Sequence, residues 1–318
     1  MTKNSILVVG ANGQIGSVLT TVLQERFGAN NIVPTDIRPS KNELANFEIL
    51  DITDRERLLF LVKKYQITQI YHLAAILSAK GESDPQWAWN LNMSGLMNVL
   101  EIARTEKIEK VFFPSSIAVF GNNTPRINTP QETVMNPSTV YGISKLAGEQ
   151  WCNYYHTKYN LDVRSIRYPG IIGYQSMPGG GTTDYAVEIY HAAVQHQPYT
   201  CFLKADTRLP MLYMSDAIRA TLELMEAPAA SIKIRTSYNL GGMDFTPAEI
   251  AASIQRELPG FKIDYQPDFR QAIADSWSES IDDTAARNDW AWKPAYDLLK
   301  MTKEMLLQLK LQYMSALK

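Results

Sequence analysis

The sequence contains few of the residues that mark disulfide-rich, metal-binding or polyanion-binding proteins. Only 2 of its 318 residues are cysteines, Cys152 and Cys201, and they have neither metal-ligand spacing nor a paired framework. We therefore expect free thiols in a reducing compartment and no metal site. The 31 basic residues nearly balance the 33 acidic ones, giving a formal net charge of -2. This balance argues against nucleic acid or an acidic membrane surface as a partner.

Long apolar runs, internal repeats and low-complexity tracts are also absent. No segment approaches the ~20 apolar residues that span a bilayer, and the first residues do not resemble a signal peptide. Together with the reduced cysteines, this predicts a cytoplasmic protein without a membrane partner. The absence of repeats excludes a solenoid.

Strand and helix patterns instead alternate along the first half of the chain. The apolar run 5–10 ends in glycine, and residues 14–27 have helical spacing of apolar side chains. Further strands are expected at 31–36, 69–75, 110–116 and 162–170, and further helices at 55–65, 88–105 and 141–159. Repeated βα units predict an α/β fold with a doubly wound parallel Rossmann sheet.

The alternation weakens after residue 172, in a stretch rich in glycine and proline. We expect two lobes from a chain of this length. Residues 1–172, with return segments near 205–242, would form an NAD-binding Rossmann domain. Residues 173–204 and 243–318 would form a smaller substrate-binding lobe.

The glycines of GANGQIG, Gly10, Gly13 and Gly16, lie between the first strand and the first helix. Without a Cβ, such a turn allows the backbone and helix N-terminus to approach a pyrophosphate. Asp36 ends the next strand, where a carboxylate can accept both ribose hydroxyls and repel a 2′-phosphate. NAD is therefore favoured over NADP, although Arg38 works against this choice.

Tyr141 and Lys145 lie four residues apart on one predicted helix face, a spacing that is weak evidence alone. Tyr154 with Lys158 and Tyr296 with Lys300 repeat it. Tyr141 differs because its helix follows the strand ending in Ser115 and Ser116. We predict that Tyr141 is the general base, that Lys145 lowers its pKa and holds the ribose, and that Ser116 orients the substrate hydroxyl. Asn92 would support Lys145 through a water.

With these motifs the sequence resembles the extended short-chain dehydrogenase/reductase superfamily, whose members include nucleotide-sugar epimerases. The segments that carry the resemblance are GANGQIG, HLAA, NLNMSGLMNVLE, PSSIAVFG, YGISK and RYPGIIG. The second half, with RYPGIIGYQSMPGGGTTDYAVEIYHAA, RLPMLYMSDAIRATLELMEAP and DSWSESIDDTAARNDWAW, is similar to the L-threonine 3-dehydrogenases of this superfamily.

The resemblance implies oxidation of the L-threonine 3-hydroxyl to 2-amino-3-ketobutyrate with NAD as hydride acceptor. It also implies a homodimer formed through the helices that contain Ala88 and Tyr141. Its substrate positions correspond to Ser78, Ser116, Tyr141, Thr182, Thr183, Asp184 and Trp277. The residues predicted to bind NAD are Gly10, Asn12, Gly13, Gln14, Ile15, Gly16, Asp36, Ile37, Arg38, Asp51, Ile52, Leu73, Ala74, Ala75, Asn92, Ser115, Tyr141, Lys145, Tyr168, Pro169, Gly170 and Ile171.

The second-lobe residues suit a small polar substrate. Thr182, Thr183 and Asp184 immediately precede a helical run at 185–194. Backbone donors there can hold a carboxylate, and Asp184 can pair with an ammonium. Helix capping is the structural alternative. The preceding glycines at 179–181 allow a hinge, so we expect a lid that closes over the substrate.

Two other functions remain open. A nucleotide-sugar epimerase or dehydratase would share the first-lobe motifs, but it would hold its diphosphate with an asparagine where this chain has Gly170. Arg208 and Arg270 remain as candidate phosphate ligands. A non-catalytic NAD-sensing protein is the second alternative, but such proteins usually lack the tyrosine and lysine that this chain retains.

Overall fold

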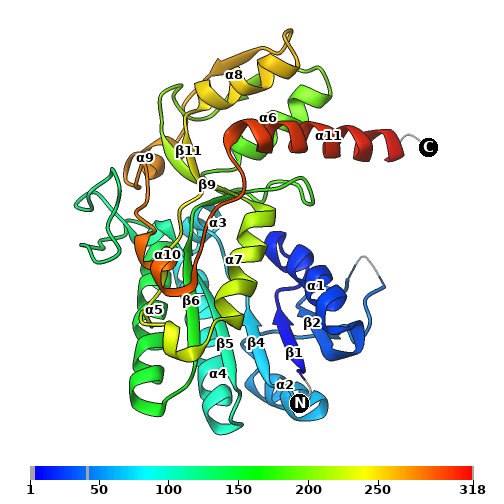
Figure 1. Ribbon diagram of the computed structural model, residues 1–318, viewed down its shortest axis with the longest axis vertical. Coiled ribbons are helices and arrows are strands. Elements are labelled where there is room, and N and C mark those ends of the chain that lie inside the picture. Colours follow the sequence, from blue (N-terminus) through cyan, green and yellow to red (C-terminus); the bar gives the residue numbers. More distant parts are fainter. Residues whose placement is uncertain (1–3, 41–42, 317–318) are drawn as a thin grey trace.

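A seven-stranded parallel sheet forms the centre of the computed structural model, which describes residues 4–40 and 43–316 (Figure 1). The strand order is β10-β6-β5-β4-β1-β2-β3. The chain builds outward from β1 in one direction and then from β4 in the other, and ligands of such sheets bind at this reversal. The strands are β1 (Ile6–Val9), β2 (Ile32–Asp36), β3 (Glu48–Ile49), β4 (Gln69–His72), β5 (Lys110–Ser116), β6 (Val163–Tyr168) and β10 (Tyr238–Asn239). This arrangement confirms the predicted fold class.

Helices cover both faces of the sheet because its strands alternate between two apolar cores. Ile6 and Val8 of β1 pack with α1 (Gln14–Phe27) and α7 (Met214–Glu226). Leu7 and Val9 face the opposite way. The helices on that side are α2 (Arg55–Tyr65), α4 (Pro85–Thr105) and α5 (Val140–Tyr159). Burial on both faces explains why the strands read as continuous apolar runs.

Two predicted boundaries differ from the structure by three residues, and the others differ by two or fewer. β4 ends at His72, three residues before the predicted end, because the chain then bends past the glycine turn while the Leu73 N–H still donates to the Val9 carbonyl. α4 begins at Pro85 rather than Ala88 because the Asp84 side chain caps it and proline is favoured in a first helical turn. Helices α1 and α2 have the predicted bounds.

Most of the remaining elements, including α6, α8, α9 and α11, surround a third apolar core above the central sheet in Figure 1. One small sheet has the order β11-β9-β7, and β12 pairs with β8 in another. These strands are β7 (Gly170–Ile172), β8 (Tyr199–Cys201), β9 (Leu209–Tyr213), β11 (Met243–Phe245) and β12 (Ile263–Tyr265). The other helices are α3 (Ser78–Ser83), α6 (Tyr185–Val194), α8 (Pro247–Glu257), α9 (Arg270–Asp275), α10 (Thr284–Trp290) and α11 (Leu298–Ala316), and short 3-10 turns are η1 (Ala29–Asn31), η2 (Ile117–Val119) and η3 (Ala229–Ser231). Among the described residues, no helix has the length and apolar character needed to cross a membrane.

Candidate active site

Glycine brings the turn between β1 and α1 close to the neighbouring chain. Gly10 has φ +87°, and a Cβ there would lie 2.8 Å from the backbone nitrogen of Ala74. A Cβ at Gly16 would overlap the Gly10 carbonyl oxygen. Side chains are strained or excluded at both positions. The N-terminus of α1, which has no acidic residue in its first turn, therefore has backbone donors suited to an anionic group.

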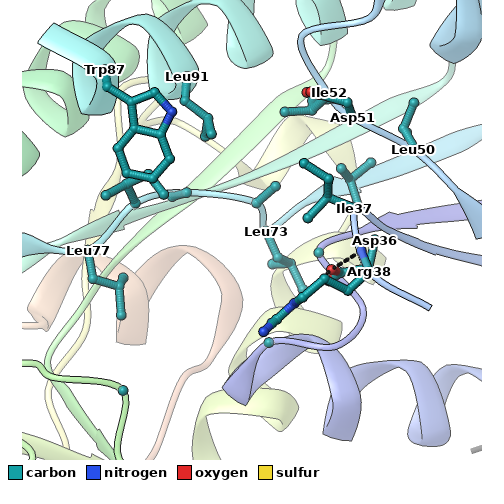
Figure 2. Close-up of a pocket in the computed structure, with 17 residues that line it drawn as sticks. Asp36, Ile37, Arg38, Leu50, Asp51, Ile52, Leu73, Leu77, Trp87 and Leu91 are labelled. Atoms are coloured by element: carbon teal, nitrogen blue, oxygen red, sulfur yellow. Dashed lines mark hydrogen bonds and ion pairs between the residues drawn. The ribbon is translucent and has the colours of Figure 1, made fainter. Parts of the chain in front are cut away.

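The Asp36 carboxylate is fixed at the end of β2. Its Oδ2 accepts from the backbone N–H of Asn12 at 3.1 Å, and its Oδ1 accepts from the backbone N–H of Arg38 at 3.1 Å. The Arg38 guanidinium approaches Oδ1 at 3.9 Å, and its side chain is 76% exposed. Figure 2 shows Asp36, Ile37 and Arg38 together beside the cavity. The carboxylate is thus oriented, while the arginine remains largely in solvent.

A cavity of about 430 Å³ lies beside this turn, and we call it the Asp36 cavity. It contains ten of the predicted cofactor residues, Gly10, Gly13, Asp36, Ile37, Arg38, Asp51, Ile52, Leu73, Ala74 and Ala75. Sequence reasoning missed seven further lining residues, Val9, Leu50, Ile76, Leu77, Trp87, Leu91 and Gly179. Trp87 and Leu91 extend from α4 toward the space in Figure 2.

A second cavity of about 160 Å³, the Tyr141 cavity, adjoins the first. The two share Leu73, Ala75 and Leu77 in their linings, so they form neighbouring parts of one site. Its other lining residues are Gln14, Ile15, Ser78, Pro114, Ser115, Ser116, Ile117, Tyr141, Lys145, Tyr168, Pro169, Gly170, Ile171, Gly181, Thr182, Thr183, Asp184 and Trp277. Every predicted substrate residue is among them. Pro114, Ile117, Leu77 and Gly181 were not predicted.

Tyr141 and Ser116 come from adjoining elements at this cavity. Thr139 caps α5 by accepting from the Gly142 N–H at 3.1 Å, so Tyr141 lies in the first helical turn. Ser116 ends β5, and its hydroxyl accepts from the Ala118 N–H at 3.1 Å. Burial raises the pKa of Tyr141 to about 12, and the neighbouring Ser116 hydroxyl opposes that shift. Tyr141 is therefore a protonated phenol at neutral pH.

Lys145 is buried on the next turn of α5 and is held by the end of β5. Its Nζ donates to the Pro114 carbonyl at 2.6 Å and lies 5.6 Å from the centre of the Tyr141 ring. Burial lowers the pKa of Lys145 to about 8, and the nearby Glu149 carboxylate opposes that shift. The ammonium thus lies close to the phenol without lowering its pKa in this conformation.

Four predicted cofactor residues differ from the rest: three lie outside both cavities, and the fourth has its hydroxyl bonded to a neighbouring side chain. Asn12, Gly16 and Asn92 lie outside the linings of both cavities. Asn92 connects two elements: it accepts from the Ile76 N–H at 2.8 Å and donates to the Ser144 hydroxyl at 3.1 Å. Ser115 lines the Tyr141 cavity, but its hydroxyl donates to Glu149 at 2.6 Å.

The segment before α6 lies against both cavities. Asp184 Oδ2 accepts from the backbone N–H groups of Gly180 and Gly181, each at 2.7 Å. The Thr182 hydroxyl is buried and has no hydrogen-bond partner within the described parts of the chain. An unpaired buried hydroxyl is costly, so its position in a cavity lining suits a polar ligand.

Gly170 lies where a larger residue would disturb the cavity wall. A Cβ at this position would lie 2.5 Å from Met211 Sδ and 2.7 Å from Thr183 Cγ2. The candidate phosphate ligands Arg208 and Arg270 are already paired with carboxylates. Arg208 donates to Asp244 at 2.7 Å and to Glu249 at 2.6 Å, and Arg270 contacts Asp268 at 2.6 Å. The space around position 170 is therefore too small for an asparagine side chain, and both arginines are already engaged by carboxylates.

Known proteins resemble the chain over nearly its whole length. An uncharacterized epimerase/dehydratase of Staphylococcus haemolyticus is 48% identical over 306 residues, which are 95% of this chain and 96% of that protein. The holo form of a GalE-like L-threonine dehydrogenase from Cupriavidus necator has 59% identity and a TM-score of 0.95, with 96% of this chain and all of that one covered. The apo form of the same protein has 54% identity and a TM-score of 0.85, with 97% of this chain and all of that one covered.

A third protein, a monomeric L-threonine 3-dehydrogenase from a metagenome, has 47% identity and a TM-score of 0.92, covering 96% of this chain and 99% of its own. The model of the NAD dependent epimerase/dehydratase family matches residues 6–241, which include the glycine turn, Asp36, Tyr141 and Lys145. The chain therefore belongs to the NAD-dependent epimerase/dehydratase family.

Proposed function

We propose that this protein is an NAD-dependent L-threonine 3-dehydrogenase, which converts L-threonine to 2-amino-3-ketobutyrate. The observation that carries the proposal is the small Tyr141 cavity, about 160 Å³, where Tyr141, Lys145 and Ser116 meet beside the Asp36 cavity. This volume suits a ligand smaller than the drug-sized molecules bound by pockets of ~300–1,000 Å³. The similar structures named L-threonine dehydrogenase support the same substrate.

The residues around the Asp36 cavity fit NAD. Backbone N–H groups at the N-terminus of α1 would hold the pyrophosphate, and the oriented Asp36 carboxylate would accept from the ribose hydroxyls. Ile37, with 60% of its surface exposed, would provide an apolar contact for the adenine. The Lys145 ammonium would leave the Pro114 carbonyl and bind the hydroxyls of the ribose attached to nicotinamide.

The proposed chemistry pairs proton removal with hydride transfer. Bound NAD supplies the hydride acceptor for C3 of threonine, and its positively charged nicotinamide ring favours the Tyr141 phenolate. Tyr141, as the phenolate, would take the proton of the 3-hydroxyl while the C3–H bond of threonine breaks. Ser116 would hydrogen-bond the substrate oxygen and keep it beside Tyr141, while Lys145 would stabilise the phenolate.

The segment 182–184 would recognise the amino acid end of the substrate. The Thr182 hydroxyl, unpaired among the described residues, and the backbone donors that begin α6 would bind the carboxylate. Both loop contacts of Asp184 end on Oδ2, so we assign Oδ1 to the ammonium. Ser78 and Trp277 complete the wall around the small substrate.

The family also contains epimerases and dehydratases, so a nucleotide sugar is the competing substrate. The crowded surroundings of Gly170 and the paired Arg208 and Arg270 disfavour it. A non-catalytic NAD-sensing role is disfavoured because Tyr141, Lys145 and Ser116 meet in one cavity.

The direct test is NADH absorbance after addition of NAD and a panel of 3-hydroxy amino acids. L-Threonine should give the fastest NADH formation. UDP-galactose should give little or no product in a parallel chromatographic assay. Turnover of UDP-galactose without threonine oxidation would overturn the substrate assignment.

We also propose a homodimer formed through α4 and α5. Large aromatic side chains remain 38–41% exposed on these helices, namely Trp89, Trp151, Tyr154 and Tyr159. Exposed aromatic patches of this kind mark protein interfaces. Sedimentation should give a dimer that Trp151→Glu dissociates. A wild-type monomer at assay concentration, like the named metagenome protein, would exclude the dimer.

A further inference from the structure

A buried ion pair lies behind the Tyr141 cavity. Glu149 of α5 and Arg167 of β6 are 0% and 2% exposed. Arg167 Nη2 donates to Glu149 Oε2 at 2.8 Å, and its Nε donates to Oε1 at 2.9 Å. Burying two charges carries a large desolvation penalty, which such a bidentate geometry offsets. The pair is therefore a strongly directional contact between a helix and a strand.

The same carboxylate also contacts the strand that carries Ser116. The hydroxyl of Ser115 donates to Glu149 Oε1 at 2.6 Å. Ser115 immediately precedes Ser116 on β5, and Glu149 lies one helical turn after Lys145 on α5. One side chain thus connects the strand end that supplies Ser116 with the helix that supplies Tyr141 and Lys145.

Arg167 anchors this connection to the rest of the protein. Its Nη1 donates to the Gln131 carbonyl and to Asn239 Oδ1, each at 3.0 Å. The Asn239 amide then donates to the carbonyls of Thr129 at 3.1 Å and Asp282 at 3.2 Å. Because each partner is itself held by backbone groups, the position of Glu149 is fixed from several directions.

We propose that Glu149 is a positioning residue, which holds α5 against β5 so that Tyr141, Lys145 and Ser116 meet the substrate in reactive geometry. The inference rests on the proposed threonine oxidation. Two further contacts join α5 to β5: the Lys145 Nζ donates to the Pro114 carbonyl at 2.6 Å, and Gly148 lies so close to the Phe113 ring that a Cβ would lie 2.5 Å from Cζ. Packing at Gly148 brings the surfaces together, whereas the hydrogen bonds of Glu149 to Ser115 on β5 and to Arg167 on β6 add a second point of alignment beside that of Lys145.

A second ion pair associated with β6 provides a matched control. Arg164 Nη2 donates to Asp162 Oδ2 at 2.7 Å, and the Arg164 side chain is fully buried. This pair lies at the start of the strand, where Arg164 also donates to the carbonyls of Leu224 and Ala227 at 2.6 and 2.7 Å. It stabilises the same strand without contacting either cavity.

The experiment compares Glu149→Gln, the double variant Glu149→Met with Arg167→Met, Ser115→Ala and Asp162→Asn. Measurements are the unfolding Tm, kcat for L-threonine, the Kd of NAD and the primary isotope effect with L-threonine deuterated at C3. Glu149→Gln and Asp162→Asn both weaken an ion pair and should lower Tm. The double variant leaves no charge unpaired and should recover much of the lost Tm.

The double variant should still have kcat reduced by about 10- to 100-fold, because a misplacement of ~1 Å at the reacting atoms can cost ~100-fold. Its isotope effect should increase as hydride transfer becomes slower, while Kd for NAD changes little. Ser115→Ala should show a smaller loss of kcat in the same direction, and Asp162→Asn should keep the wild-type kcat when folded.

Wild-type kcat in Ser115→Ala, or in the folded double variant, would overturn the positioning role. So would an equal loss of kcat in Asp162→Asn. A wild-type protein that does not oxidise threonine would overturn the proposed function and this inference with it. An active wild type whose variants are also fully active would overturn this inference alone.

Discussion

The two adjoining cavities are assembled from the chain in different ways. The Asp36 cavity is lined almost entirely by residues between Val9 and Leu91, with Gly179 as the exception. Most of them lie at or just beyond the ends of β1, β2, β3 and β4, and Trp87 and Leu91 come from α4. The Tyr141 cavity collects short segments from Gln14 to Trp277. A cofactor site built on consecutive strand ends has a local sequence pattern, whereas a site built by convergence requires the whole fold.

The comparison predicts that chemistry and cofactor binding can be separated by mutation. Tyr141→Phe removes only the phenolic oxygen from the Tyr141 cavity and should lower kcat by ~10²- to 10⁴-fold, the usual contribution of general acid/base assistance. The Kd of NAD, measured by titration, should change little because Tyr141 does not line the Asp36 cavity.

Tyr154→Phe is the matched control. Tyr154 has the same spacing to Lys158, whose Nζ donates to its hydroxyl at 2.7 Å and lowers the pKa of that phenol, but the pair is exposed on α5. This substitution should be nearly neutral for kcat. Equal losses in the two variants would contradict the separation of Tyr141 from the other tyrosine–lysine pairs.

Asp36→Ser should have the reverse effect, weakening the cofactor and sparing the chemistry. Hydrogen bonds to a charged group contribute about 1.5–3 kcal/mol, so Kd for NAD should rise by roughly 10- to 100-fold. NADP should bind better because the repulsion is removed and Arg38 is exposed nearby. Asp51→Asn, in the same cavity but with Oδ1 bonded to Thr53, should have a smaller effect. Wild-type activity with NADP equal to that with NAD would refute this role.

The rate of threonine oxidation should depend on pH through the ionisation of Tyr141 and Lys145. With its pKa raised to about 12 by burial, Tyr141 holds its proton throughout the neutral range, so the base form increases as pH rises. The value of kcat/KM for threonine should increase by up to about tenfold per pH unit from neutral pH. The rise should flatten when Lys145, whose pKa burial lowers to about 8, loses its charge.

Addition of NAD should also produce a phenolate absorbance difference in the wild type that Tyr141→Phe lacks, because the cationic ring favours ionisation. A pH-independent kcat/KM between neutral pH and the onset of unfolding would exclude Tyr141 as the titrating base. Isotope effects at each pH establish that chemistry limits the measured rate.

The sequence predicted the backbone of the site better than its side-chain contacts. Helical spacing and the glycine turn gave α1 with its observed bounds, and the acidic residue ending β2 lies in the expected cavity. The short strand β3 and helix α3 were missed because two and six residues are too few to show a period.

The contacts of Asn92, Ser115 and Glu149 depend on packing between distant elements. Asn92 binds Ile76 and Ser144, where spacing suggested support for Lys145. Glu149 gave one usable signal: it is a charged residue four positions after Lys145, on the same helix face. Its partner Arg167 is one of two arginines buried on β6, and only the fold shows which carboxylate each of them meets.

The smallest expected effect concerns the segment that connects the two cavities. Gly179 lines the Asp36 cavity, while Gly181 and Asp184 line the Tyr141 cavity. Gly180 has φ +92°, a conformation that glycine adopts without strain, and Asp184 holds the N–H groups of Gly180 and Gly181. The glycines allow this segment to act as a hinge, and the Asp184 carboxylate holds it in one conformation. A ligand that fills both cavities would contact the segment at Gly179 and at Asp184.

We expect this segment to become more ordered when both cavities are filled. Hydrogen exchange of residues 175–185 should therefore slow by a few-fold with NAD plus a non-reactive threonine analogue, because closure excludes water from the site. Residues 55–65 of α2 provide the internal control, since they line neither cavity and should exchange at unchanged rates. Identical protection of residues 175–185 with and without ligands would show a permanently ordered loop, in which the glycines only permit the turn and opening does not limit NADH release.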